Sequence, residues 1–294
     1  MISYGKYSFL IVTILRVFLG AVILYVVLCF FLYLYQDQLL YYPKALDENR
    51  SEQLRALHPY VEEILMTMDD GITIHGWRVD GNSEVEGGAA GTVLYYGGNA
   101  EEVSWMIEEA LRFPKWTFVL MNYRGYGLSG GSPGEKQLFQ DAIQVYDELA
   151  ARKCIDPSNT IIMGRSLGTG VGIYLAAHRP VSGAVLISPY DSMIKVAQDT
   201  YFFLPVKYLL KDKFQVVKWA PGLTIPLHAF IAMDDQIIRT ERSFRLLDFW
   251  GGEVYLTKAA DVGHNDLVHS PSYREFVTSS LQQLEDRLNN HQIW

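Results

Sequence analysis

Residues 160–178, "TIIMGRSLGTGVGIYLAAH", constrain the fold of this chain more than any other segment. A short apolar run ends in Gly164-Arg165-Ser166-Leu167-Gly168, and a stretch rich in small residues, typical of a helix, follows it. Glycines two positions either side of a serine allow a turn so tight that larger side chains would collide with neighbouring backbone. The pattern therefore predicts a strand that turns sharply into a helix, with the Ser166 hydroxyl projecting over the C-terminal edge of the sheet.

A serine hydroxyl becomes a good nucleophile only when a base takes its proton and an acid holds that base. On this type of turn the acid and then the histidine follow the serine along the chain. His264, in "DVGHNDL", lies in a loop after the last predicted strand, and we expect it to be the base. Four other downstream histidines are less suitable, because they fall in predicted helices or strands or at the chain end: His178, His228, His269 and His291.

The predicted acid lies at the end of the preceding strand, "AFIAMDDQII". Asp234 and Asp235 both follow this strand, and Asp235 is preferred over Asp234. Asp191, in "SPYDS", is the third candidate, because some hydrolases place the acid one strand earlier. An adjacent Asp pair at a strand end is ordinarily a solvated turn, so this assignment depends on those of Ser166 and His264.

A tetrahedral oxyanion requires two hydrogen-bond donors. One expected donor is the N–H of Leu167, directly after the serine. The other is expected in the glycine-rich loop at residues 97–100, "GGNA", where the N–H of Asn99 is the candidate. Taken alone, Gly-Gly-Asn would predict only an ordinary turn.

The rest of the chain alternates between apolar runs and helical patterns. "ILMTMDDGITIHGWRV" predicts a hairpin, and the runs in "GTVLYYGG", "WTFVLM", "SGAVLI", "PLHAFIA" and "GEVYLTKAA" predict buried strands. Buried strands that alternate with helices indicate an α/β fold with a mostly parallel sheet covered on both faces. Residues 83–91, "SEVEGGAAG", are expected to form a surface loop.

Residues 17–36, "VFLGAVILYVVLCFFLYLYQ", contain no Lys, Arg, Asp or Glu. Twenty helical residues extend about 30 Å, the thickness of a bilayer core. A cleaved signal peptide has a shorter apolar part and a small-residue cleavage site, so we expect a retained single-pass anchor rather than a signal peptide or a buried soluble helix. Lys6 and Arg16 precede this run, and basic residues also follow it, which only slightly favours a main domain on the non-cytoplasmic side.

The composition excludes some classes of function. The formal net charge is −8, and no cluster of Lys and Arg is present to bind the phosphates of nucleic acid. The two cysteines, Cys29 and Cys154, lie in separate regions, so no structural disulfide is expected. No CxxC or His/Cys cluster predicts a zinc site, and we expect neither a metal nor an organic cofactor.

Residues 64–284 resemble the α/β-hydrolase superfamily, and more narrowly its membrane-anchored Bem-type branch, the bud-emergence-related serine hydrolases. The matching pieces are "YYGGNAEE", "MNYRGYGLSGGSPGE", "DPSNTIIMGRSLGTGVGIYLA", "VLISPYDS", "FLPVKYLLKDKF", "IPLHAFIAMDDQII" and "GHNDL". The resemblance implies Ser166 as nucleophile, Asp235 as acid and His264 as base, with Asn99 and Leu167 as oxyanion donors. Two positions depart from the pattern: Gly97 replaces a histidine and Ala232 replaces a glycine. Neither change removes a catalytic group.

From the sequence we expect an anchor segment at residues 1–36, a connector at 37–60 and a hydrolase domain at 61–294. A short insertion after Asp191 is too small for an independent cap domain, and its "YFFL" fits an acyl pocket, contact with lipid or a plain cover of the sheet. The expected activity is cleavage of carboxylic esters or thioesters with acyl or lipid-like groups. The alternatives are a peptidase or amidase on the same fold and a non-catalytic membrane-tethered scaffold.

Overall fold

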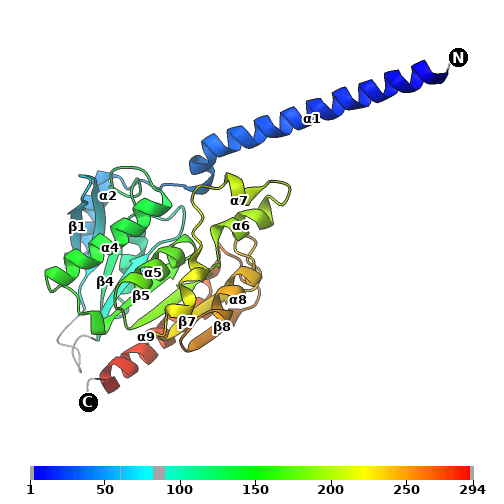
Figure 1. Ribbon diagram of the computed structural model, residues 1–294. Helices are drawn as coiled ribbons and strands as arrows, with labels where there is room; N and C mark the ends of the chain where they lie inside the picture. Colours follow the sequence, from blue (N-terminus) through cyan, green and yellow to red (C-terminus); the bar gives the residue numbers. More distant parts are fainter. Residues whose placement is uncertain (1–2, 60, 82–89, 292–294) are drawn as a thin grey trace.

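The computed structural model describes residues 3–59, 61–81 and 90–291. Its centre is one eight-stranded sheet with the order β1-β2-β4-β3-β5-β6-β7-β8 (Figure 1). The strands are β1 Val61–Thr67, β2 Thr73–Val79, β3 Gly91–Tyr96, β4 Trp116–Met121, β5 Thr160–Arg165, β6 Gly183–Ile187, β7 Leu227–Ala232 and β8 Val254–Ala259. β1 and β2 form the predicted antiparallel hairpin, β2 pairs antiparallel with β4, and every other pairing is parallel. The predicted fold class is therefore confirmed.

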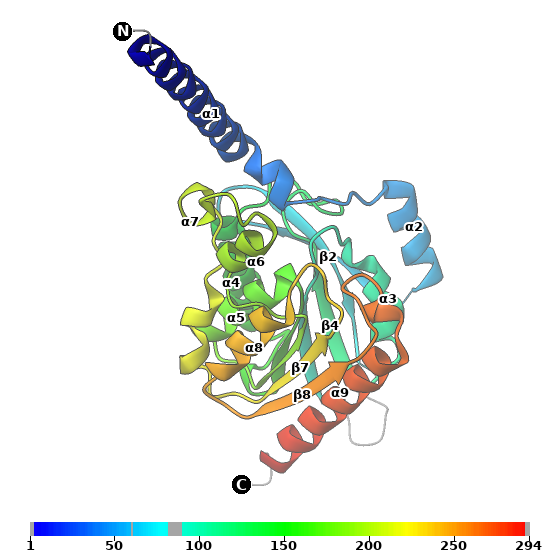
Figure 2. The ribbon, with the colours of Figure 1, turned by 90° about the vertical axis from the view of Figure 1, so that its right-hand side faces the viewer.

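Helices cover both faces of the sheet, as Figure 2 shows. The α-helices are α1 Ser3–Leu40, α2 Glu48–Leu57, α3 Met106–Ala110, α4 Glu135–Ala151, α5 Leu167–His178, α6 Met193–Thr200, α7 Val206–Leu209, α8 Thr240–Asp248 and α9 Pro271–His291. Short 3₁₀ turns lie at Val103–Trp105, Pro157–Asn159, Val216–Lys218, Ala220–Gly222 and Leu267–His269. Helices α4, α5 and α8 pack on one face, and α2, α3 and α9 pack on the other.

The two cores follow from the alternation of side chains along each strand. In β5, Ile162 points into the core beneath α4 and α5, whereas Ile161 and Met163 point into the opposite core. All three are fully buried. A sheet covered on both faces needs apolar residues at successive positions, and this is why its strands read as continuous apolar runs.

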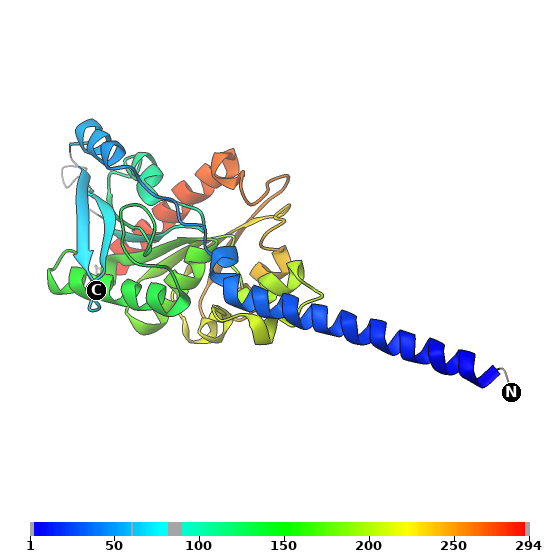
Figure 3. The same ribbon diagram turned by 90° about the horizontal axis from the view of Figure 1, so that it is seen from above.

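Helix α1 extends away from the sheet domain (Figures 1 and 3). Its residues 7–40 are long and apolar enough to cross a membrane, and most of their side chains are exposed. The helix continues past the predicted end at Gln36 to Leu40. Exposed apolar side chains along a helix are unfavourable in water and favourable in lipid, which is the environment that this segment fits.

The connector contains a helix that we did not predict. Asp47 caps α2 by accepting a hydrogen bond from the N–H of Asn49, and Leu54 is buried beneath it. The cap insertion consists of α6, α7 and two 3₁₀ turns, and it lies beside the lower end of α1 (Figure 1). The surface loop expected at residues 83–91 falls mainly on residues 82–89, outside the described part of the chain.

Candidate active site

Ser166 occupies the turn between β5 and α5, as the glycine pattern predicts. Its φ of +49° lies in the left-handed region, which non-glycine residues rarely adopt. The turn has no space for larger neighbours, because a Cβ on Gly164 would lie 2.7 Å from the carbonyl oxygen of Gly168. The N–H of Ser166 donates to the carbonyl of Ile187 on β6 at 2.9 Å, which fixes the strained residue to the sheet.

The structure brings the three predicted triad residues together from three strand ends. His264 Nε2 lies 3.0 Å from Ser166 Oγ, and His264 Nδ1 lies 2.7 Å from Asp235 Oδ2. The other carboxylate oxygen of Asp235 accepts the N–H groups of Ile237 at 2.9 Å and Ile238 at 2.7 Å. These bonds fix the orientation of the carboxylate toward the imidazole.

The alternative acids have other surroundings. Asp234 is exposed, and its N–H donates to the carbonyl of Val262. Asp191 is buried, and its carboxylate lies 3.2 Å from the guanidinium of Arg242. Burial raises the pKa of Asp191. The carboxylate that reaches the imidazole is that of Asp235.

The alternative histidines also have other contacts. His228 is buried and stacks on Tyr255 with 4.7 Å between ring centroids. Burial lowers the pKa of His228 to about 4. His178 stacks on Tyr174, and His269 ends a short 3₁₀ turn. His264 is the histidine whose imidazole reaches Ser166.

The glycine-rich loop packs directly against the serine turn. A Cβ on Gly98 would lie 3.7 Å from the Cβ of Ser166, and a Cβ on Gly168 would collide with the carbonyl oxygens of Tyr96 and Gly97. The N–H of Leu167 is the first of α5 and has no acceptor within its helix. Among the described residues, none accepts a hydrogen bond from the N–H of Asn99. Both predicted oxyanion donors therefore remain available to another acceptor.

The sequence analysis assigned no role to Glu101, which joins several parts of the site. Its carboxylate accepts hydrogen bonds from four groups: Tyr95 Oη, Gly98 N, Trp105 Nε1 and Arg165 Nη1. Burial, together with the charge of Glu101, raises the pKa of Tyr95 well above its ordinary value, so this phenol stays protonated and donates. The signal in the sequence was limited to an acidic residue four positions after Gly97, and no local pattern indicated that it meets Arg165.

Arg165 extends this network to the histidine loop. Its Nη1 lies 3.1 Å from Glu101 Oε2, and its Nη2 donates to the carbonyl of His264 at 3.4 Å. One buried carboxylate thus connects the glycine-rich loop to the serine turn and, through Arg165, to the loop that carries His264.

The "YRGYG" motif at residues 123–127 supports the same loop from the other side. Tyr123 Oη donates to the carbonyl of Gly97 at 2.7 Å, and Tyr126 Oη donates to Asn99 Oδ1 at 2.8 Å. Burial raises the pKa of both phenols, so both remain donors.

Within the described residues, no group of three or more His, Cys, Asp or Glu is placed to hold a metal ion.

Comparisons with known proteins agree with the fold. A family model described as the alpha/beta hydrolase fold matches residues 85–219. An uncharacterized protein of Mycobacterium tuberculosis is 29% identical over 238 residues, which cover 80% of this chain and 83% of the relative. The alpha/beta hydrolase domain-containing protein 17C of Xenopus tropicalis is 26% identical over 220 residues, 70% of this chain and 68% of that protein.

Solved structures share the architecture. An esterase of Pyrococcus furiosus superposes with a TM-score of 0.62 at 16% identity, covering 84% of this chain and all of the esterase. Identity at this level shows the fold alone. Taken together, the sheet order, the serine turn and the family matches show the α/β-hydrolase fold and support a place for the chain in the α/β-hydrolase superfamily.

Proposed function

We propose that this protein is a membrane-anchored serine hydrolase that cleaves carboxylic esters or thioesters. The observation that carries the proposal is the hydrogen-bonded series from Ser166 through His264 to Asp235, with atom separations of 3.0 Å and 2.7 Å. An imidazole held between a carboxylate and a strained serine is the arrangement that activates a hydroxyl for acyl transfer.

Acylation begins when Ser166 Oγ attacks the acyl carbonyl carbon. Nε2 of His264 takes the hydroxyl proton, and the carboxylate of Asp235 stabilises the imidazolium and its productive tautomer. The negative charge that develops on the carbonyl oxygen accepts hydrogen bonds from the N–H groups of Leu167 and Asn99. The imidazolium then gives its proton to the departing alcohol or thiol, which leaves an acyl-Ser166 ester.

Deacylation uses the same groups. His264 Nε2 takes a proton from water, the hydroxyl attacks the acyl-Ser166 carbonyl, and the two amides again bind the oxyanion. Collapse of the tetrahedral intermediate breaks the bond to Ser166 Oγ, which recovers its proton from His264. The products are a carboxylic acid and an alcohol or thiol, and the enzyme returns to its starting state.

The proposed location is a membrane, with α1 as a single span. The charge-free run at residues 17–36 is long enough to cross a bilayer core. The proposed side of the hydrolase domain is non-cytoplasmic, because Lys6 and Arg16 precede this run. Insertion and orientation can be tested by glycosylation mapping with acceptor sites placed before α1 and on the exposed surface of α2.

A fluorophosphonate probe tests the chemistry, since it forms a covalent bond with an activated serine. We expect labelling of the full chain in detergent and its complete loss in Ser166→Ala. Ser158→Ala is the matched control, because Ser158 lies at the opposite end of β5 and should leave labelling intact. A folded wild-type protein that does not react would favour the non-catalytic scaffold.

Paired substrates separate esterase from amidase. A p-nitrophenyl ester and the p-nitroanilide of the same acid differ only in the leaving group. We expect the ester to be cleaved with the higher kcat/KM. Preferential cleavage of the anilide would assign the protein to the peptidase or amidase class instead.

A further inference from the structure

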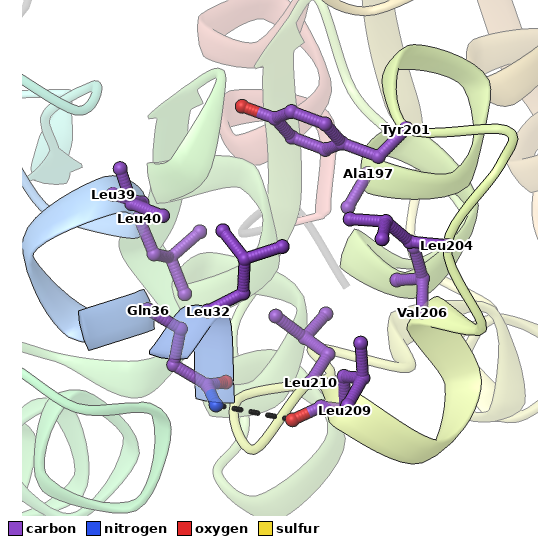
Figure 4. A pocket seen from close by; sticks show the side chains of 10 residues that line it. All are labelled: Leu32, Gln36, Leu39, Leu40, Ala197, Tyr201, Leu204, Val206, Leu209 and Leu210. Carbon is purple, nitrogen blue, oxygen red and sulfur yellow. Dashed lines mark hydrogen bonds between the residues drawn. The ribbon is translucent and has the colours of Figure 1, made fainter. Parts of the chain in front are cut away.

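An apolar pocket lies between the end of α1 and the cap insertion. Figure 4 shows side chains from both elements that point toward one another across it. Its cavity volume is about 100 Å³, and beyond this volume the pocket opens to the outside of the molecule. Its walls include Leu32, Leu39 and Leu40 of α1 and Ala197, Leu204 and Leu209 of the cap.

The polar group of Gln36, which also lines this pocket, is fully engaged by the backbone. Its Nε2 donates to the carbonyls of Tyr33 at 2.8 Å and Leu209 at 3.0 Å. Its Oε1 accepts the N–H of Lys211 at 2.7 Å. These bonds join α1 to the cap. Because the amide is already hydrogen-bonded to the protein, it does not require a polar ligand, and the pocket suits a hydrocarbon.

The cap also reaches far along α1, to the level of its membrane-spanning run. Tyr25 Oη donates to the carbonyl of Phe203 at 2.8 Å. Tyr25 lies within the charge-free run and about 16 Å up the helix from Gln36. Phe202 and Phe203 are exposed at this level, with 81% and 52% of their surfaces accessible. If α1 spans the bilayer, this tip of the cap and the mouth of the pocket face lipid rather than water.

The inner end of the pocket is connected to the oxyanion loop. The Asn99 side chain donates to the carbonyl of Leu40 and accepts the N–H of Tyr42 at 3.0 Å. Leu40 is itself a pocket wall, and Gly98, beside Asn99, packs on Ser166. Ser166 does not line the pocket, so a molecule held there must extend past Leu40 to reach the nucleophile.

From these contacts we infer that α1 and the cap together form an acyl-chain site, which takes the long chain of a lipid ester directly from the bilayer and directs its carbonyl to Ser166. This inference rests on the proposed function. A lipid chain fits because the walls are apolar, the mouth lies beside the membrane-spanning run and the inner end approaches the oxyanion loop. In this arrangement the anchor is one wall of the substrate site.

The test uses the full chain reconstituted in phosphatidylcholine vesicles, with p-nitrophenyl palmitate and p-nitrophenyl acetate as substrates. Leu32→Trp fills the pocket from α1, and Ala197→Phe fills it from the cap. We expect each variant to lower kcat/KM for the palmitate by about tenfold or more, while the value for the acetate stays within about twofold.

Leu34→Trp is the matched control. Leu34 is exposed and lies two residues from Leu32, on nearly the opposite side of the helix. The same substitution there should leave both substrates unchanged. Equal losses on the two esters, or no loss on the palmitate in either filled variant, would overturn the acyl-chain site.

A second measurement does not depend on turnover. A phosphatidylcholine with a diazirine on its palmitoyl chain is placed in the vesicles with Ser166→Ala protein and irradiated. Adducts should map to α1 and α6 residues that line the pocket and should disappear in Leu32→Trp combined with Ser166→Ala. If the wild-type protein is not labelled by the fluorophosphonate but the pocket adducts form, the proposed hydrolase activity is refuted and the lipid site is retained. Labelling without pocket adducts would do the reverse.

Discussion

The carboxylate of Glu101 and the guanidinium of Arg165 form a largely buried ion pair, 3.1 Å apart, beside the turn that carries Ser166. Glu101 follows β3 and Arg165 ends β5, which are neighbouring strands of the sheet. The pair therefore fixes the glycine-rich loop relative to the serine turn. Since the N–H groups of Asn99 and Leu167 lie on these two segments, we interpret Glu101 as a positioning residue for the oxyanion hole.

Glu101→Gln should impair both stability and turnover. A neutral amide cannot accept all four hydrogen bonds, and Arg165 loses its charge partner; breaking a buried pair typically costs about 3–5 kcal/mol. We expect a lower Tm and a lower kcat on a short-chain ester with little change in KM. Glu102→Gln is the matched control, because Glu102 binds Ser104 and Asn122 instead of the serine turn. A wild-type kcat in folded Glu101→Gln would refute the positioning role.

Asp235→Asn should lower kcat by roughly 10⁴-fold, because an amide at this position favours the wrong imidazole tautomer. Asp234→Asn should retain wild-type kcat, since Asp234 is exposed. Asp191→Asn removes one of the two carboxylates that pair with Arg242, so Tm should fall while kcat is retained. Steady-state kinetics and thermal unfolding on the three variants distinguish these effects. A dominant loss in Asp191→Asn would reassign the acid.

Gly168→Ala should disrupt the site through contact with the backbone. The added methyl group would collide with the carbonyl oxygens of Tyr96 and Gly97, and overpacking of this kind typically costs about 1–3 kcal/mol. We expect a lower Tm and much slower fluorophosphonate labelling. Gly222→Ala is the control, because a Cβ there meets nothing within 4 Å. Unchanged labelling in Gly168→Ala would show that the loop after Tyr96 can shift to accommodate the methyl group without reducing the reactivity of Ser166.

His228 should make stability depend on pH. Burial lowers its pKa from 6.5 to about 4, so between these values the unfolded chain binds a proton that the folded chain does not. The free energy of unfolding should therefore rise by about 3 kcal/mol between pH 4 and pH 6.5 from this group. His75, whose pKa burial also lowers, acts in the same direction.

Chemical denaturation of wild type and His228→Phe across this pH range measures the contribution. The phenyl ring can keep the stack on Tyr255 and cannot titrate. We expect the variant to show a shallower rise in stability with pH. Identical slopes in the two proteins would show that His228 is protonated equally in the folded and unfolded states.

Much of the fold and the triad geometry could be predicted from the sequence because the relevant constraints are local. The turn at Ser166 needs glycines at fixed offsets, and the base and acid follow it in a fixed order at strand ends. The continuous apolar runs predicted a sheet buried on both faces, as the structure has it. The positions of His264 and Asp235 followed from this chain order.

Features that depend on which strands are neighbours could not be predicted. Glu101 meets Arg165 only because β3 and β5 pair, and no local pattern records that contact. The helix α2 was missed because its sequence is mostly polar, although Asp47 is a good N-cap residue. The pocket depends on where α1 lies against the cap, a relationship between residues more than 150 positions apart.

The attachment of α1 to the cap determines the orientation of the sheet domain relative to this helix. Three hydrogen bonds attach this part of the chain to the cap. Within α1, Tyr25 binds Phe203 and Gln36 binds Leu209, and Tyr41, directly after the helix, binds Asp212. Because the bonds lie at separate positions along α1 and just after it, they restrict rotation of the sheet domain relative to the helix more than a single flexible contact would. The tilt of α1 relative to its surroundings therefore sets the orientation of the whole sheet, and the mouth of the pocket keeps a constant direction.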